Sequence, residues 1–268
     1  MICCYTFVPR SANTRDAEEA AMALDLRLQT ESDLSYAKMI RYRLAGKAAS
    51  VCEDRYFIAM DGSQCISRIW YGWGRHACAV GNFGNFMTAE EYQGRGIGSM
   101  VFRELQKSVE KSSDLPLGLF CSCSQMHLVK MYGRLGFRPA IAGTDRGALY
   151  CPLGGSPGSF DEFCDMYSTE SDSLHFAPGT VEYRHEVDCL LNFALRTCSE
   201  ALGLASFRNY EGAFLALEED PALGKLERIA TQEDKTVGWA FTPSGSDQRE
   251  IQLHPRYRNM PIEERLLK

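Results

Sequence analysis

Three closely spaced glycines expose a stretch of backbone that could contact a ligand. They are Gly94, Gly96 and Gly98. They follow an apolar run, residues 83–88, and precede an amphipathic segment, residues 99–111, an order typical of a strand, a turn and a helix. Such a turn points backbone N–H groups outward at the positive end of the helix, where they can bind phosphate. The sequence therefore predicts an anion site at residues 93–99.

The spacing of these glycines excludes two common phosphate-binding motifs. The pattern is G-x-G-x-G, so the dinucleotide fingerprint G-x-G-x-x-G is not met, and no Gly-Lys-Ser/Thr of a nucleotide P-loop follows. The stretch Gln93–Gly98 does fit Gln/Arg-x-x-Gly-x-Gly/Ala, and in this it resembles the acyl-CoA pyrophosphate loop of the GNAT superfamily of N-acetyltransferases. The alternative is a glycine-rich turn without a ligand.

A second segment, residues 124–137, is similar to the other signature of that family. It predicts a short helix that ends in Tyr-x-x-Leu-Gly-Phe, from Tyr132 to Phe137. Ser124 is expected to cap the start of this helix. Gly136 is expected to adopt the left-handed conformation, with Phe137 folding back as the apolar contact.

The resemblance implies an α/β fold with a mixed sheet, the GNAT-like acyl-CoA N-acyltransferase fold, followed by a smaller α+β domain. We expect an extension (1–23), a GNAT acetyltransferase domain (24–153), a linker (154–159) and a C-terminal domain (160–268). The C-terminal domain is either unrelated or a degenerate second copy. It lacks a glycine-rich loop, so it could not bind CoA in the same way.

Hydrophobic periodicity predicts the elements that position these motifs. Strands are expected at residues 1–8, 24–30, 55–60, 64–70, 77–88, 117–123, 148–153, 226–231 and 236–242. Helices are expected from about residue 33 to 44 and at 99–111, 181–202 and 210–217, with an irregular end from Ile251.

The resemblance also implies roles for individual residues. The backbone N–H groups of the loop would hold the CoA pyrophosphate: Gln93, Gly94, Arg95, Gly96, Ile97, Gly98 and Ser99. The backbone of Phe86, Met87 and Thr88 would pair with the pantetheine arm like an added strand. Tyr132 would lie near the thioester sulfur and protonate the leaving thiolate; the alternative is a packed aromatic residue.

A general base is not visible in the sequence. The strand before the loop carries no acidic residue. Glu53, Asp54 and His76 remain candidates that could act through a water, and the amine could equally arrive deprotonated. We therefore assign no base.

The implied reaction moves an acetyl group directly from acetyl-CoA, a co-substrate, to a primary amine of a small molecule or peptide, without a metal. One alternative is a non-catalytic acyl-CoA-binding or sensing protein. Another is a GNAT-fold enzyme that uses a different donor, such as an aminoacyl-tRNA. No basic patch with interleaved aromatic residues stands out, which disfavours nucleic acid as a partner.

Composition agrees with a globular protein in the cytoplasm. The 268 residues are 45% hydrophobic and 24% charged, with no apolar run of the ~18 residues that a membrane span needs. The N-terminus lacks the basic start of a signal peptide. The 11 cysteines contain no C-x-x-C and suit no zinc site, so we expect reduced, buried thiols.

The charge differs between the two parts of the chain. Residues 1–153 hold 18 Lys and Arg against 15 Asp and Glu, a net +3, and the remainder holds 11 against 20, a net −9. The acidic part could attract a cationic amine and shape the acceptor site; the alternative is a solvated acidic surface. The sequence leaves the oligomeric state open, a homodimer included.

Overall fold

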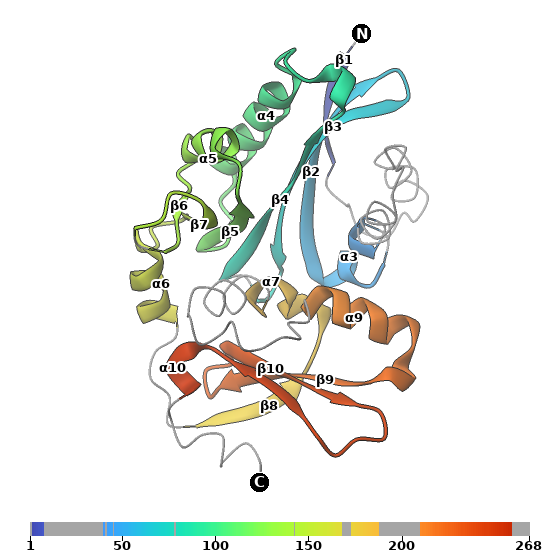
Figure 1. Cartoon of the computed structure of the whole chain (residues 1–268), viewed down its shortest axis with the longest axis vertical. Coiled ribbons are helices and arrows are strands. Elements are labelled where there is room, and N and C mark those ends of the chain that lie inside the picture. Colours follow the sequence, from blue (N-terminus) through green and yellow to red (C-terminus); the bar gives the residue numbers. More distant parts are fainter. Residues whose placement is uncertain are drawn as a thin grey trace. The chain divides into compact units, whose positions relative to one another are not determined.

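The computed structural model describes residues 2–7, 40, 42–44, 46–77, 79–141, 143–167, 173–187 and 210–258. It divides into two compact units, Met1–Leu119 (unit 1) and Phe120–Lys268 (unit 2) (Figure 1). Strands and helices interleave along the chain, and residues 174–253 contribute a second sheet. This confirms the expected α/β fold class and the α+β character of the C-terminal part.

Unit 1 contains four strands, and each runs antiparallel to the next one along the chain. They are β1 (Ile2–Phe7), β2 (Cys52–Asp61), β3 (Gln64–Gly74) and β4 (Val80–Thr88). Each pairs with the next, and β1 pairs with β2 along its whole length, so the N-terminal segment forms part of the sheet. The strand expected at residues 24–30 lies outside the described residues.

One face of this sheet is covered by the predicted amphipathic helix, α4 (Ile97–Lys111) (Figure 1). Its buried residues are Ile97, Val101, Phe102, Leu105 and Val109, which confirms the apolar stripe that the sequence predicts. Two shorter helices flank the strands, α3 (Ala48–Val51) and the 3-10 turn η1 (Glu90–Tyr92).

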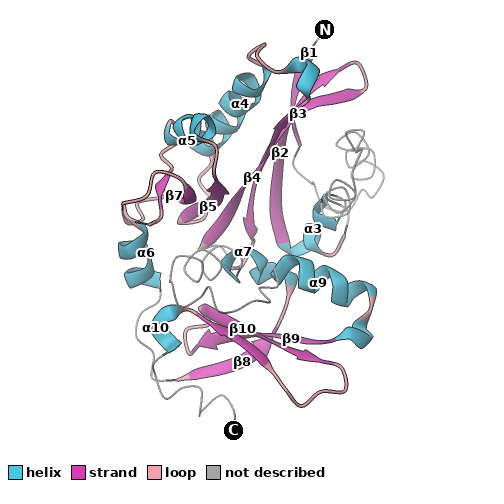
Figure 2. Ribbon diagram, in the orientation of Figure 1, coloured by secondary structure: helices cyan, strands magenta, loops and turns pink. Residues whose placement is uncertain are grey.

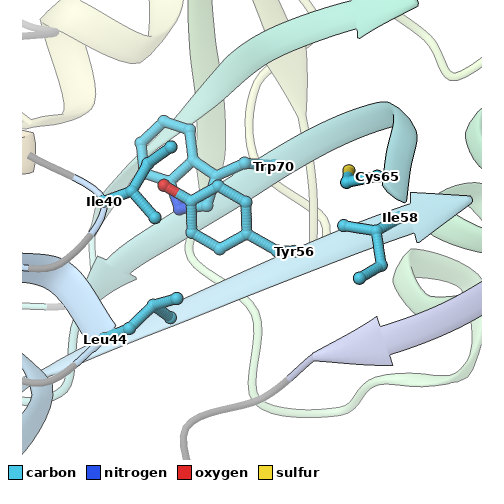
Figure 3. Packing of buried hydrophobic residues seen from close by; sticks show 6 residues of the cluster. All are labelled: Ile40, Leu44, Tyr56, Ile58, Cys65 and Trp70. Carbon is cyan, nitrogen blue, oxygen red and sulfur yellow. The ribbon is translucent and has the colours of Figure 1, made fainter. Parts of the chain in front are cut away.

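The other face of the sheet packs against the helical residues 40 and 42–44. Ile40 and Leu44 lie in one buried cluster with Tyr56 and Ile58 of β2 and with Trp70 of β3 (Figure 3). Side chains alternate between faces along a strand, so Phe57 and Tyr71 point to the α4 side, where the Tyr71 hydroxyl lies 2.8 Å from Ser108 Oγ.

Unit 2 begins within β5 (Gly118–Cys123) and continues through small elements around an aromatic core. These are α5 (Met126–Gly133), β6 (Arg138–Pro139), β7 (Gly147–Pro152) and α6 (Phe160–Tyr167). Phe120 and Tyr150 contact Phe160 and Phe163 of α6, at ring-centroid distances of 5.3 to 6.1 Å. The sequence did not predict α6.

The expected linker, residues 154–159, is held by hydrogen bonds. The Leu153 N–H donates to Ser156 Oγ at 3.0 Å, and the Tyr150 hydroxyl donates to the Pro157 carbonyl at 3.0 Å. Arg138 donates to the Gly158 carbonyl at 3.1 Å. The glycine-rich segment therefore has a defined path between β7 and α6.

The second sheet, which lies in unit 2, is antiparallel, in the order β11-β10-β9-β8. Figure 2 labels its strands β8, β9 and β10. Its strands are β8 (Leu174–Pro178), β9 (Gly224–Thr231), β10 (Thr236–Pro243) and β11 (Glu250–Leu253). Short helices accompany it: η2 (Val181–Tyr183), α7 (Arg184–Glu186), α9 (Tyr210–Glu219), η5 (Pro221–Leu223) and α10 (Pro255–Arg258). Phe214 and Leu217 of α9 pack against Leu226, Trp239 and Phe241.

Three of the predicted C-terminal elements are confirmed, namely α9, β9 and β10. The irregular end expected from Ile251 is wrong, because Ile251 and Leu253 of β11 and Tyr257 of α10 join a buried cluster with Ile229 and Val237. Of the helix expected at residues 181–202, the structure describes 181–187 as η2, α7 and Val187, and residues 188–202 lie outside the described part.

Candidate functional site

The loop between β4 and α4 places two glycines in the left-handed region. Gly94 has a φ of 73° and Gly96 a φ of 77°, which residues with a Cβ rarely adopt. A Cβ built at either position would meet no atom within 4 Å. The loop backbone therefore borders open space, as the approach of a bulky anion requires.

Six consecutive backbone N–H groups, from Gly94 to Ser99, donate to no acceptor in the part of the chain that the structure describes. The first regular bond of the helix runs from the Met100 N–H to the Gly96 carbonyl at 3.0 Å. Gly96 is the N-cap of α4 and offers no side chain to the open N–H groups. These donors and the positive end of the helix dipole form a site that favours a phosphate group.

Gln93 and Gly98 have other roles within the predicted loop. The Gln93 N–H donates to the Glu90 carbonyl, and its side-chain Nε2 donates to the Thr88 carbonyl at 3.1 Å. A Cβ at Gly98 would lie 2.9 Å from the Phe86 ring and 3.0 Å from Thr88 Oγ1. Gly98 thus lets the first turn of α4 pack closely on the end of β4.

A tyrosine that the sequence analysis did not single out anchors the loop. The Tyr92 hydroxyl donates to Asp61 Oδ2, at the β2–β3 turn, at 3.0 Å. The Arg95 guanidinium lies 5.3 Å from the centre of the Tyr92 ring, within the range of a cation–π interaction. Arg95 is exposed, so its charge stands at the border of the loop. Because the two anchor residues are 31 positions apart, no local motif reveals them.

The strand that leads into the loop contains a β-bulge. Met87 pairs with Arg68 and Gly84 pairs with Trp70, so Asn85 and Phe86 of β4 face the single residue Ile69 of β3. Asn85 has a φ of 54°, in the left-handed region. The residues from Phe86 to Thr88, whose backbone is predicted to pair with the pantetheine arm, begin within this bulge and are half-buried.

Tyr132 lies in unit 2, at the last turn of α5, and is buried with 4% of its surface exposed. Its ring packs on Phe137 at 6.0 Å, and its carbonyl accepts the Leu135 and Phe137 N–H groups. Gly136 has a φ of 102°, which confirms the predicted left-handed turn. The predicted cap by Ser124 is wrong, because α5 begins one residue later, with Gln125 as its N-cap.

Burial raises the pKa of the Tyr132 phenol well above its usual range, and the nearby Cys121 and Cys123 raise it further. Both thiols are buried in β5, on either side of the exposed Ser122. Burial also raises the pKa of the Cys121 thiol. Tyr132 therefore keeps its proton over the whole physiological range.

The candidate bases are engaged in other interactions or lie at the surface. Asp54 is fully buried and accepts a hydrogen bond from the Trp70 indole at 2.9 Å. Glu53 lies between Arg55 at 3.2 Å and Arg75 at 3.5 Å. His76 is exposed. The structure thus does not single out a general base among them.

No group of three His, Cys, Asp or Glu side chains within the described residues could hold a metal ion. None of the helices in the described ranges is long and apolar enough to cross a membrane.

Comparison with known proteins gives one family match. Residues 20–137, less than half of the chain, match the model of the acetyltransferase (GNAT) family, and no curated protein sequence matches the chain. Among solved structures, Escherichia coli ElaA is similar at 15% identity and a TM-score of 0.40, covering 56% of this chain and 99% of its own.

Two other similar structures were solved with a coenzyme. A GNAT-family acetyltransferase from Brucella melitensis, in complex with acetyl-CoA, has 16% identity and a TM-score of 0.38, covering 58% of this chain and 92% of its own. The PaiA N-acetyltransferase from Thermoplasma acidophilum, in complex with coenzyme A, has 14% identity and a TM-score of 0.34, covering 56% of this chain and 99% of its own. The match over residues 20–137 identifies this part of the chain as an acetyltransferase domain of the GNAT family, an acyltransferase by enzyme class.

Proposed function

We propose that this acyltransferase moves an acetyl group from acetyl-CoA to a primary amine of a small molecule or peptide. The observation that carries the proposal is the run of six unbonded N–H groups, from Gly94 to Ser99, at the N-terminus of α4. In a domain of this family, such a run suits the pyrophosphate of an acyl-CoA.

The chain's own residues would hold the donor at two places. The N–H groups from Gly94 to Ser99 donate to the pyrophosphate, and Arg95 adds a positive charge beside it. The backbone of Phe86, Met87 and Thr88 pairs with the amides of the pantetheine arm, in the manner of an added strand. Because the pyrophosphate and the pantetheine arm are both held, less entropy is lost when the thioester is aligned for the reaction.

Tyr132 would assist departure of the thiolate. The amine nitrogen bonds to the thioester carbonyl carbon, the carbon–sulfur bond breaks, and the sulfur leaves with the bonding electron pair. The Tyr132 hydroxyl donates a hydrogen bond, and then its proton, to that sulfur. Because burial raises the pKa of this phenol, transfer to a thiolate is uphill, so the hydrogen bond in the transition state is its main contribution. The proton of the amine goes to water or to a base that remains unassigned.

Incubation of the full chain with acetyl-CoA and a panel of primary amines tests the proposal, with free thiol as the readout. We expect thiol release that depends on the amine, together with an acetylated product detected by mass. Binding of acetyl-CoA without thiol release for any amine would favour the sensing protein. Failure to bind acetyl-CoA would favour another donor. The cytoplasmic location and a homodimer stay predictions.

A further inference from the structure

The bulge in β4 is joined by a hydrogen bond to the buried face of the sheet. Asn85 Nδ2 donates to the Tyr56 hydroxyl at 3.4 Å, near the long end of hydrogen-bond distances. The left-handed region is unfavourable for a residue with a Cβ, although Asn tolerates it better than most. A contact from the Asn85 side chain therefore helps to hold the backbone conformation that makes the bulge.

The hydroxyl of Tyr56 receives a second donor. Arg43 Nη1 donates to it at 3.2 Å, and both side chains are buried. Tyr56 belongs to β2, so this one oxygen connects β2, the bulge in β4 and the helical residues 42–44. Figure 3 shows Tyr56 beside Trp70 of β3, with Ile40 and Leu44 in the same cluster.

The side chain of Arg43, which donates to Tyr56, is itself held by a contact with Trp70 of β3. Its guanidinium carbon lies 3.8 Å from the centre of the Trp70 ring, a cation–π contact that is strong when buried. The Trp70 indole donates to the fully buried Asp54 at 2.9 Å. Tyr56 and Trp70 are cross-strand partners. The Tyr56 oxygen thus belongs to a network that runs through Arg43 and Trp70 to Asp54.

We propose that Tyr56 is a positioning residue for the acyl donor. Through Asn85 it fixes the bulge, and the bulge sets the direction of the backbone at Phe86 and Met87. This inference rests on the proposed function, in which that backbone pairs with the pantetheine arm. Tyr56 is fully buried, so it acts through the shape of β4 rather than by contact with the donor.

Tyr71 provides a matched control on the opposite face of the same sheet. It is also fully buried, and its hydroxyl accepts a hydrogen bond from an arginine, Arg55 Nη1, at 3.2 Å. Its other partner is Ser108, near the C-terminal end of α4 and far along the helix from the glycine loop. Loss of this hydroxyl removes the same kind of buried hydrogen bond without a contact to the bulge.

Calorimetric titration of the full chain with acetyl-CoA tests the proposal. The variants are Tyr56→Phe, Asn85→Gly, their combination and Tyr71→Phe. Glycine at position 85 permits the left-handed backbone and removes only the side-chain contact. We expect Tyr56→Phe and Asn85→Gly each to weaken binding about three- to tenfold, the effect of one lost hydrogen bond, with no further loss in the double variant.

Tyr71→Phe should keep the affinity for acetyl-CoA within about twofold while lowering the melting temperature as much as Tyr56→Phe does. In steady-state assays, Tyr56→Phe should raise the Michaelis constant for acetyl-CoA and leave that for the amine unchanged. Wild-type affinity in Tyr56→Phe, additive losses in the double variant, or an equal loss in Tyr71→Phe would overturn the positioning role. A wild-type chain that does not bind acetyl-CoA would overturn the proposed function itself, and this inference with it.

Discussion

Two β-bulges in this molecule have different surroundings. In β4, the bulge at Asn85 and Phe86 is followed by half-buried backbone and then by a loop whose N–H groups are unbonded. In β10, Val237 is an extra residue between the pairs Thr236–Ala230 and Gly238–Ile229. There a Cβ at Gly238 would overlap with the Gln252 carbonyl of β11, and the residues from Thr236 to Phe241 are all buried.

The comparison shows that an irregular strand does not by itself make a site. The bulge in β10 is enclosed between β9 and β11, and apolar clusters on the two faces of the sheet contain the bulged Val237 and the nearby Trp239. The bulge in β4 is followed by the exposed loop with its unbonded backbone N–H groups. We therefore expect changes near β4 to affect donor binding and turnover, and changes near β10 to affect stability alone.

The largest expected effect is on turnover. Tyr132→Phe removes one hydroxyl and little volume, and should lower the maximal rate by between about 10- and 10⁴-fold, the scale of general acid catalysis. The Michaelis constant for the donor should change little. The matched variant is Tyr150→Phe, which removes a buried hydroxyl that bonds the Pro157 carbonyl. The measurement is the initial rate at saturating concentrations of both substrates. Equal rates in wild type and Tyr132→Phe would show that Tyr132 is a packing residue.

The next effect is on donor affinity. Gly96→Val places a branched side chain in the open space before the loop and should weaken acetyl-CoA binding about a hundredfold or more, since charge-assisted hydrogen bonds contribute ~1.5–3 kcal/mol each. Gly245→Val is the control, because Gly245 also has a positive φ, 70°, with no atom within 4 Å of its Cβ. Both substitutions place valine at a similar positive φ. Calorimetry should show a loss of acetyl-CoA affinity in Gly96→Val alone. Equal affinities of wild type and Gly96→Val would show that the loop is not part of the donor site.

A change beside the second bulge should affect stability only. Trp239 is buried with 2% of its surface exposed, so Trp239→Ala should lower the free energy of unfolding by ~3–5 kcal/mol. Urea titration measures this loss. Donor affinity, measured at a temperature where the variant is folded, should equal that of wild type. A weakened affinity would show that the second sheet supports the donor site.

The smallest expected effect depends on pH. Burial raises the pKa of Glu186 to about 7 from 4.5, against the lowering effects of Tyr167, Thr236 and Arg228. The folded state then binds a proton that the unfolded state has lost, so this group destabilises the fold progressively as pH rises from 4.5 to 7. Glu186→Gln mimics the protonated form and should raise the unfolding free energy by up to ~3 kcal/mol above pH 7, with no gain near pH 4.5.

Urea titrations at pH 5 and pH 8 measure this difference. Glu233→Gln removes a carboxyl whose side chain is 71% exposed, and it serves as the control. A Glu186→Gln gain that is the same at both pH values would refute the assignment of the titration to this carboxyl.

Much of the structure before residue 154 could be predicted because its sequence signals are local. The apolar stripe of α4 and the left-handed Gly136 follow from patterns within a few residues of each other. The bulge at Asn85 could not be predicted, because it depends on the register between β3 and β4. The same holds for Tyr92, whose partner Asp61 lies 31 residues away, and for Tyr56 with Asn85.

Short elements in the second part depend on tertiary packing in the same way. Four residues of β11 and five of β8 carry too little periodicity to identify a strand. The division of the chain at residues 154–159 and the roles of Phe86–Thr88, Gln93–Ser99 and Tyr132 stay predictions.

The packing of α6 has a practical consequence for work with shortened chains. Phe160 and Phe163 cover Phe120 and Tyr150, and hydrogen bonds hold the path between β7 and α6. A protein cut at the glycine-rich segment would expose two large aromatic rings to water and would tend to aggregate. Recombinant versions made for crystallisation or screening should therefore keep α6 together with the second sheet, because Tyr167 of α6 is buried beside Glu186 and Arg228.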